Sequence, residues 1–157
     1  MYFPFGISEI QILRSHIILL RKTEFYHNTN KKILYYISAI RLHLLQNKYV
    51  MHIPINTCDV GLSIAHVGPI VINSKAKIGK NCRIYVGVNI GEGSRRVPTI
   101  GDNVFIGPGC KIFNEIMIAD GCKIGANTVV NKSFNIENSI VAGIPARLLK
   151  IDDVEKC

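Results

Sequence analysis

From residue 78 onward, apolar side chains return at every sixth position of the chain. The first run comprises Ile78, Ile84 and Ile90. After four inserted residues, a second run comprises Ile100, Ile106, Ile112, Ile118, Ile124, Val130 and Ile136, and Ala142 extends it. A period of six fits neither the 3.6-residue repeat of a helix nor the two-residue repeat of an ordinary strand. It is typical of a parallel β-helix, in which three six-residue sides make one rung of about 18 residues.

A second set of small or apolar residues recurs four positions after the first. It comprises Cys82, Val88, Val104, Cys110, Ile116, Cys122 and Thr128. Both sets are expected to point inward and to stack on their counterparts in neighbouring rungs. The three cysteines of this set are therefore expected to be core residues and not reactive thiols. Residues 58–147 give about five rungs.

The chain before residue 50 follows a different pattern. Residues 7–25 and 31–49 show helical spacing of Ile and Leu, which predicts two helices. The segment "HNTN" at 27–30 offers N-cap candidates between them. Their apolar faces are expected to pack against protein and not to anchor in a membrane. Residues 52–57 then lead into the β-helix.

Composition narrows the class of protein. The 157 residues are 48% hydrophobic and 19% charged, which indicates a globular chain. The longest apolar run near the N-terminus, 16–20, is too short to span a membrane, so a cytoplasmic protein without stable membrane insertion is expected. Five cysteines without a C-x-x-C pair predict reduced thiols and no zinc or redox motif. The net charge of +8 indicates either solubility or an anionic partner. The basic residues are dispersed along the sequence, so a phosphate-bearing small molecule is a better candidate for that partner than nucleic acid.

From about Tyr49 to Lys150 the chain resembles the hexapeptide-repeat acyltransferases, and within them the serine acetyltransferase group. The motifs that carry the resemblance are "IAHVGPIVIN", "IGKNCRIYVGVNIG", "RVPTIGDNVFIGPGCKIF", "CKIGANTVV" and "VAGIPARLLK". The resemblance implies a left-handed coil, a homotrimer, acetyl-CoA as co-substrate, a small-molecule hydroxyl acceptor and no metal. The expected fold is thus mainly β: a short helical segment at 1–48, a left-handed parallel β-helix at 49–150 and a tail at 151–157.

His66 is the expected general base. If Ile64 and Ile70 point inward, His66 faces outward, although a shift of the repeat near residues 70–72 leaves an inward imidazole open. Imidazole titrates near pH 6.5 and can take the proton of an attacking hydroxyl at neutral pH. In the family, an Asp fifteen residues earlier orients this histidine, but that position is Met51 here. His52, Asp59 or a carboxylate from elsewhere remain candidates for this role.

The resemblance also implies a set of binding residues. The positions that match CoA contacts in the family are Gly91, Pro108, Lys123, Ala126 and Arg147. Lys123 and Arg147 can meet phosphate groups. On the acceptor side, Arg96 in the loop 91–98 could bind a carboxylate with two hydrogen bonds, and His52 is a second candidate.

Two departures from the family leave the acceptor open. The family's second histidine in the insertion loop is Val97 here, and the residue before the catalytic histidine, often Asp, is Ala65. Three functions are therefore carried forward. The first is a serine O-acetyltransferase-like enzyme. The second is a sugar O-acetyltransferase in surface polysaccharide biosynthesis, and the third is a non-catalytic hexapeptide-repeat binding or scaffold protein.

Overall fold

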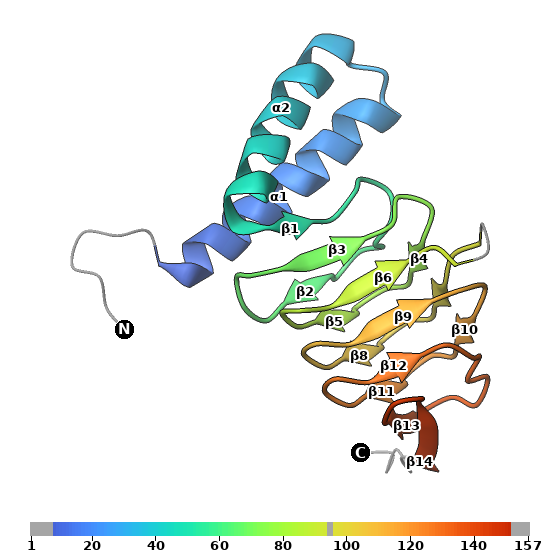
Figure 1. Cartoon of the computed structure of the whole chain (residues 1–157). Coiled ribbons are helices and arrows are strands. Elements are labelled where there is room, and N and C mark those ends of the chain that lie inside the picture. Colours follow the sequence, from blue (N-terminus) through green and yellow to red (C-terminus); the bar gives the residue numbers. More distant parts are fainter. Residues whose placement is uncertain (1–7, 94–95, 152–157) are drawn as a thin grey trace, which may run out of the picture.

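A parallel β-helix with a helical hairpin packed on its first rung makes up the protein (Figure 1). The structure is a computed structural model that describes residues 8–93 and 96–151. The hairpin consists of α1 (Glu9–Asn28) and α2 (Lys32–Tyr49). The expected tail at 151–157 lies outside the described residues except for Ile151, which ends the last strand.

The two predicted helices are present, but the expected N-cap between them is wrong. α1 starts with a capping box, in which the Ser8 and Gln11 side chains each accept a hydrogen bond from the other's backbone N–H. It continues to Asn28, so part of the "HNTN" segment belongs to α1. α2 follows Lys31, which makes no side-chain cap. Asn30 adopts a φ of 55°, a left-handed conformation that asparagine tolerates, and so serves the turn instead.

The strands of the coil form three sheets. The five-strand sheet contains β1 (Met51–His52), β3 (Ile70–Ile72), β6 (Asn89–Gly91), β9 (Lys111–Phe113) and β12 (Val129–Val130). The three-strand sheet contains β4 (Lys77–Ile78), β7 (Thr99–Ile100) and β10 (Met117–Ile118). The six-strand sheet contains β2 (Ser63–Ile64), β5 (Arg83–Ile84), β8 (Phe105–Ile106), β11 (Lys123–Ile124), β13 (Ser139–Ala142) and β14 (Arg147–Ile151).

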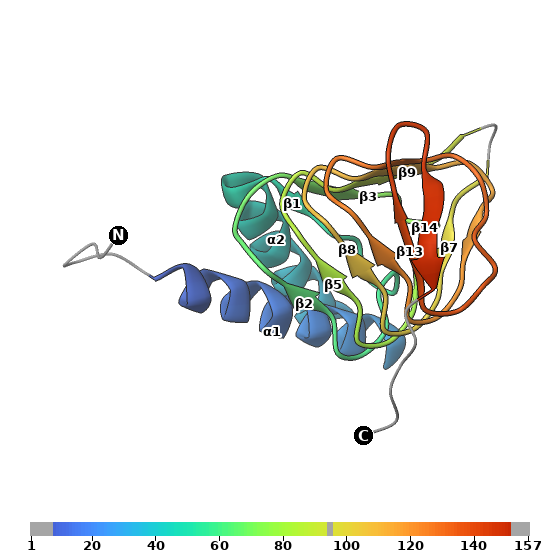
Figure 2. The same cartoon turned by 90° about the horizontal axis from the view of Figure 1, so that it is seen from below.

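Chain direction confirms the predicted coil. All strand pairs are parallel except β13–β14, an antiparallel hairpin that closes the coil at its far end. Seen from below, the rungs lie over one another and enclose one interior (Figure 2). Backbone hydrogen bonds therefore run from rung to rung along the axis, as a β-helix requires.

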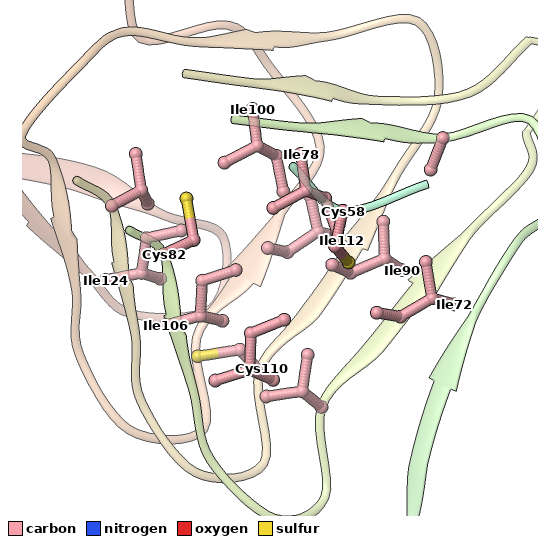
Figure 3. Close-up of a cluster of buried hydrophobic side chains, with 14 of the residues drawn as sticks. Cys58, Ile72, Ile78, Cys82, Ile90, Ile100, Ile106, Cys110, Ile112 and Ile124 are labelled. Atoms are coloured by element: carbon pink, nitrogen blue, oxygen red, sulfur yellow. The ribbon is translucent and has the colours of Figure 1, made fainter. Parts of the chain in front are cut away.

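The six-residue period fills the interior as predicted. Ile84, Ile106 and Ile124 occupy one column of the six-strand sheet, and all three are fully buried. Cys82, Cys110 and other members of both inward sets point into the same interior (Figure 3). A buried aliphatic side chain contributes about 1.5–3 kcal/mol relative to an exposed one, so these columns hold the coil together.

The repeat was predicted to continue through Ile136 and Ala142, and this is wrong. Ile118 forms its bridge with Phe134, and Ile124 pairs with Val141. Phe134 and Val141 are buried, whereas Ile136 is 51% exposed. The segment after Val130 is shorter than a regular rung, so the inward positions shift along the sequence.

Burial of the four described cysteines lowers their reactivity. Desolvation raises the pKa of Cys58 and Cys82 to about 11, and raises the pKa of Cys110 and Cys122 above its ordinary range. Thiolate is the reactive form, and it is scarce at neutral pH under these conditions. We expect a maleimide to modify these four residues only after unfolding, as measured by mass spectrometry of each peptide. Rapid labelling of the native protein at any of the four would contradict this prediction.

The apolar faces of the helices are only partly used for packing. Leu20 of α1 and Leu42 of α2 join the core, as expected. Other apolar residues of the hairpin, among them Ile18, Ile33 and Ile40, are more than half exposed on this chain. Among the described residues, no helix combines the length and apolar character needed to cross a membrane.

His16 is a fully buried histidine between the hairpin and the first rung. Its Nδ1 has no hydrogen-bond partner among the described residues, and its Nε2 lies 3.4 Å from the Gln46 amide nitrogen. That amide nitrogen also donates to the Ile53 carbonyl oxygen. No ion pair of His16 is found among the described residues, and desolvation by burial lowers the pKa of His16 below its ordinary value by more than a hydrogen-bonding contribution from the Met51 backbone raises it.

This burial predicts acid sensitivity of the fold. The unfolded chain takes up a proton on residue 16 near pH 6.5 and the folded chain takes it up only at lower pH, so stability falls as the pH drops below about 6.5. The slope from this one group is at most about 1.4 kcal/mol per pH unit. Urea unfolding between pH 7.5 and 5.0 should show a smaller loss for His16→Leu than for the unchanged protein. Equal losses would assign the acid sensitivity to other groups.

Candidate active site

His66 lies on an outer corner of the coil. It follows β2 and precedes β3, where the chain passes from the six-strand sheet to the five-strand sheet. Ile64 and Ile70 on either side are buried, while the His66 side chain is 59% exposed. The outward orientation predicted from the repeat is thus confirmed, and the inward alternative is wrong.

The turns at this corner stack into one continuous edge of the coil. Gly87 N–H donates to the Pro69 carbonyl, Gly109 N–H to the Val86 carbonyl and Asn127 N–H to the Pro108 carbonyl, over 2.6–2.9 Å. We call the turns 65–69, 85–87, 107–109 and 125–127 the His66 edge. The structure therefore brings two predicted CoA residues, Pro108 and Ala126, onto the same edge as His66, and both are exposed.

Aromatic side chains line the coil below His66. The Tyr85 ring lies 6.1 Å from the His66 ring, and the Phe105 ring lies 5.1 Å from that of Tyr85, between ring centroids. Lys123 pairs with Phe105 in the next rung of the six-strand sheet, and its side chain is exposed. A basic residue thus lies one rung from the aromatic pair.

Arg147 lies at the far end of the coil. It begins β14, opposite Ala142, and is exposed. Because β14 joins the same six-strand sheet as β11, Arg147 and Lys123 share one face of the coil, separated by β13. Two exposed basic side chains therefore lie on one face of the coil.

Two predicted residues lie at the opposite end of the five-strand sheet. Gly91 is the last residue of β6, and Arg96 follows in the insertion loop. A Cβ added at Gly91 would meet only the Asn89 Oδ1, at 3.5 Å. A Cβ at Gly107, by contrast, would lie 2.7 Å from the Ile124 carbonyl oxygen of the next rung. Packing within the chain therefore requires glycine at 107 but not at 91.

The structure does not bring the predicted acceptor residues to His66. Arg96 forms an ion pair with Glu115, and its backbone pairs with Gly93 within the loop. His52 lies on β1, opposite Val71 on the outer face of the five-strand sheet. In one chain, His66, Arg96 and His52 therefore occupy three separate places.

A carboxylate that the sequence did not single out reaches His66. The Glu9 Oε1 lies 3.3 Å from the His66 Nδ1 and accepts a hydrogen bond from the Val67 N–H at 2.8 Å. Of the earlier candidates, Asp59 accepts a hydrogen bond from the Val60 N–H, and His52 lies on β1. Met51, at the position of the family's Asp, is fully buried. The helical spacing at 7–25 predicts a helix that contains Glu9, but not which corner of the coil that helix approaches.

Two clefts of the chain lie away from this edge. One, of about 490 Å³, lies between α1 and the first rungs and is lined by Arg21, Asn56, Lys77 and neighbouring residues. The other, of about 530 Å³, lies on the helical hairpin, beside Ile18 and Arg41. His66 lines neither cleft.

The arrangement at His66 suits proton transfer. With a carboxylate at Nδ1, the neutral imidazole carries its proton there and keeps a lone pair on Nε2. An exposed Nε2 can accept a proton from a bound hydroxyl. Among the described residues, no group of three His, Cys, Asp or Glu side chains is placed to hold a metal ion.

Known proteins share this pattern and this fold. Residues 98–132 match the family described as bacterial transferase hexapeptide (six repeats). A serine acetyltransferase of Staphylococcus aureus (strain Mu50 / ATCC 700699) is 41% identical over 97 residues, covering 59% of this chain and 45% of that protein.

Two solved structures extend the similarity to the helical hairpin. Neisseria gonorrhoeae serine acetyltransferase in complex with serine has a TM-score of 0.70 at 30% identity, covering 87% of this chain and 56% of the other. The coenzyme A complex of Brucella abortus strain S19 serine acetyltransferase has a TM-score of 0.70 at 29% identity, covering 85% and 54%. The resemblance to hexapeptide-repeat acyltransferases of the serine acetyltransferase type is confirmed, although the chain spans less than half the length of the curated relatives it matches.

Proposed function

We propose that this chain catalyses acetyl transfer from acetyl-CoA to a hydroxyl of a small molecule, in the manner of a serine O-acetyltransferase. The observation that carries the proposal is an exposed His66 with a carboxylate at its Nδ1, on the edge that also holds Pro108 and Ala126. Relatives named as serine acetyltransferases, one solved with serine and one with coenzyme A, support the substrate class.

The proposed reaction uses His66 as general base. The acceptor hydroxyl donates to Nε2, and the proton moves to the imidazole as the oxygen attacks the thioester carbonyl. The new C–O bond gives a tetrahedral oxyanion, which collapses by breaking the C–S bond and releasing the CoA thiolate. The imidazolium then returns its proton to solvent or to the thiolate. Alignment of acceptor and thioester supplies much of the remaining acceleration.

We propose that the working site is shared between copies in a homotrimer. His66 with Pro108 and Ala126 lies at one end of the five-strand sheet, and Gly91 with Arg96 lies at the other. Neither group forms a closed pocket with the other in one chain. A neighbour related by a three-fold axis could place its Gly91 end against the His66 edge and so enclose CoA.

A sugar acceptor is the second candidate. Arg96 is already paired with Glu115, so it is not available for an acceptor carboxylate unless that pair opens. Ala65 and Val97 also replace polar residues that the serine-specific enzymes carry on the acceptor side. These features favour an acceptor without a carboxylate, such as a sugar that is acetylated on a hydroxyl during surface polysaccharide biosynthesis.

A CoA-release assay with matched acceptors tests the proposal. L-serine, ethanolamine (which lacks the carboxylate of serine) and a panel of sugars would be compared at equal concentration. Release with serine but not ethanolamine supports the serine-type acceptor, and release only with sugars supports the second candidate. No release with any acceptor, despite measurable CoA binding, favours a non-catalytic binding protein.

The shared site is tested separately by multi-angle light scattering at the assay concentration. A trimer that dissociates with loss of activity on dilution supports it. A fully active monomer excludes it.

A further inference from the structure

We infer that Glu9 is the positioning residue of His66, so that the helical hairpin completes the catalytic base. This inference rests on the proposed function. Glu9 is the first residue of α1, outside the hexapeptide repeat altogether. Its carboxylate takes the place of an orienting group that neither Met51 nor Asp59 can supply.

One carboxylate oxygen of Glu9 contacts two nitrogen atoms of the turn 65–69. Oε1 lies 3.3 Å from the His66 Nδ1 and 2.8 Å from the Val67 backbone nitrogen. The imidazole of His66 and the backbone of Val67 thereby contact the same carboxylate oxygen. The His66 and Glu9 side chains are 59% and 49% exposed, so the hydrogen bond from Val67 is what adds to a pairing between two surface groups.

Glu9 is itself held by the start of α1. The Ser8 N–H donates to the Gln11 side chain at 2.8 Å, and the Gln11 N–H donates to the Ser8 hydroxyl at 3.3 Å. Further along α1, the Arg21 guanidinium donates to the Cys58 and Asp59 carbonyl oxygens of the first rung. The capping box orders the first turn of α1, and Arg21 ties the helix to the first rung, which together limit how far the Glu9 carboxylate can move.

The contact selects one form of the imidazole. A carboxylate accepts hydrogen bonds and cannot donate them when ionised, so it keeps the proton of neutral His66 on Nδ1. Nε2 then carries the free lone pair, directed away from Glu9. Tyr85 also lies beside the His66 ring, and the Arg83 guanidinium lies 5.4 Å from the Tyr85 ring centroid. Among the interactions described, Glu9 is the acidic partner of His66.

The consequence is that the β-helix alone does not hold a complete base. Any change that shifts α1 on the first rung also shifts Glu9 and therefore the orientation of the imidazole. The hairpin packs through Leu20 and Leu42 into the same core as the coil, so the position of the carboxylate is determined by core packing.

The decisive experiment is a set of substitutions at Glu9 with and without His66. Glu9→Ala should lower kcat about 10–100-fold, the usual effect of losing an orienting partner, with little change in the KM for acetyl-CoA. Glu9→Gln should lose less than Glu9→Ala, because the amide oxygen can still accept from Nδ1. In the His66→Ala background, Glu9→Ala should cause no further loss, since the residue acts only through His66.

Ring-nitrogen NMR gives a readout that a purely structural role would not change. The ¹⁵N shifts of neutral His66 should show the Nδ1-protonated form in the unchanged protein, and a mixture of both forms in Glu9→Ala. If Glu9→Ala is too unstable to assay, Glu9→Lys decides, because an ammonium cannot accept a hydrogen bond from Nδ1 and should shift neutral His66 away from the Nδ1-protonated form. An unchanged spectrum in Glu9→Lys would overturn the role of Glu9.

The outcomes separate this inference from the function it rests on. Full turnover of Glu9→Ala, with turnover lost in His66→Ala, overturns the role of Glu9 and leaves the function standing. An equal loss from Glu9→Ala in both His66 backgrounds also overturns it, since the residue would then act on the structure generally. Full turnover of His66→Ala overturns the proposed function itself.

Discussion

Replacing His66 by alanine is expected to lower turnover by about 10²–10⁴-fold, the usual contribution of general-base catalysis. The alcohol proton then has no acceptor at the site near neutral pH. Affinity for acetyl-CoA should change little, because the imidazole faces the acceptor. The fold should also survive, since the side chain is 59% exposed and lies outside the core.

Steady-state kinetics with the acceptor found by CoA release, together with thermal unfolding, would measure this effect. His43→Ala is a matched control, because His43 is an exposed histidine on α2 that contacts Asn47. It should keep the rate of the unchanged protein. Undiminished turnover in His66→Ala would remove the proposed mechanism, and an unfolded variant would show that the exposed position has a structural role.

Replacing Ile106 by alanine is expected to destabilise the protein by about 2–5 kcal/mol. Ile106 is fully buried between Ile84 and Ile124 in one column of the six-strand sheet. Neighbouring rungs are fixed by their backbone hydrogen bonds and cannot close around the missing side chain. The lost burial and the remaining cavity therefore both add to the cost.

Ile136→Ala is the matched control for the Ile106 substitution. The six-residue period alone assigns Ile136 to the same inward set as Ile106, but the structure leaves it 51% exposed. Its replacement should change the free energy of unfolding by less than about 0.5 kcal/mol, as for an ordinary surface substitution. Urea unfolding of both variants would test this. Equal destabilisation by the two substitutions would show that Ile136 is a core residue and that the six-residue repeat continues without a shift.

The period of six determined most of the fold. From Ile78 to Val130 the sequence identified the inward column, and it placed Cys82, Cys110 and Cys122 in the core. This was possible because each rung repeats the same local geometry, so that one short pattern specifies every rung. The prediction failed at Ile136 and Ala142, where one shortened turn changed the phase and nothing in the local spacing marked the change.

The candidate site was also predicted in part from the sequence. The sequence placed His66 outward, because the repeat determines which side of a strand each residue faces. The family resemblance singled out Pro108 and Ala126 as CoA contacts, which stays a prediction, and the structure places both on the same edge because equivalent turns recur in each rung. The separation of Gly91 and Arg96 from His66 follows from the path of the chain around the coil.

Only the tertiary structure decided the partner of His66. Glu9 is far from His66 in sequence and belongs to a helix with a different period, so no repeat relates the two residues. Their contact depends on how α1 packs on the first rung through Leu20, and on the corner that its first turn then reaches. A periodic sequence determines its own coil, whereas the docking of a non-periodic segment is set by side-chain packing between elements that share no pattern.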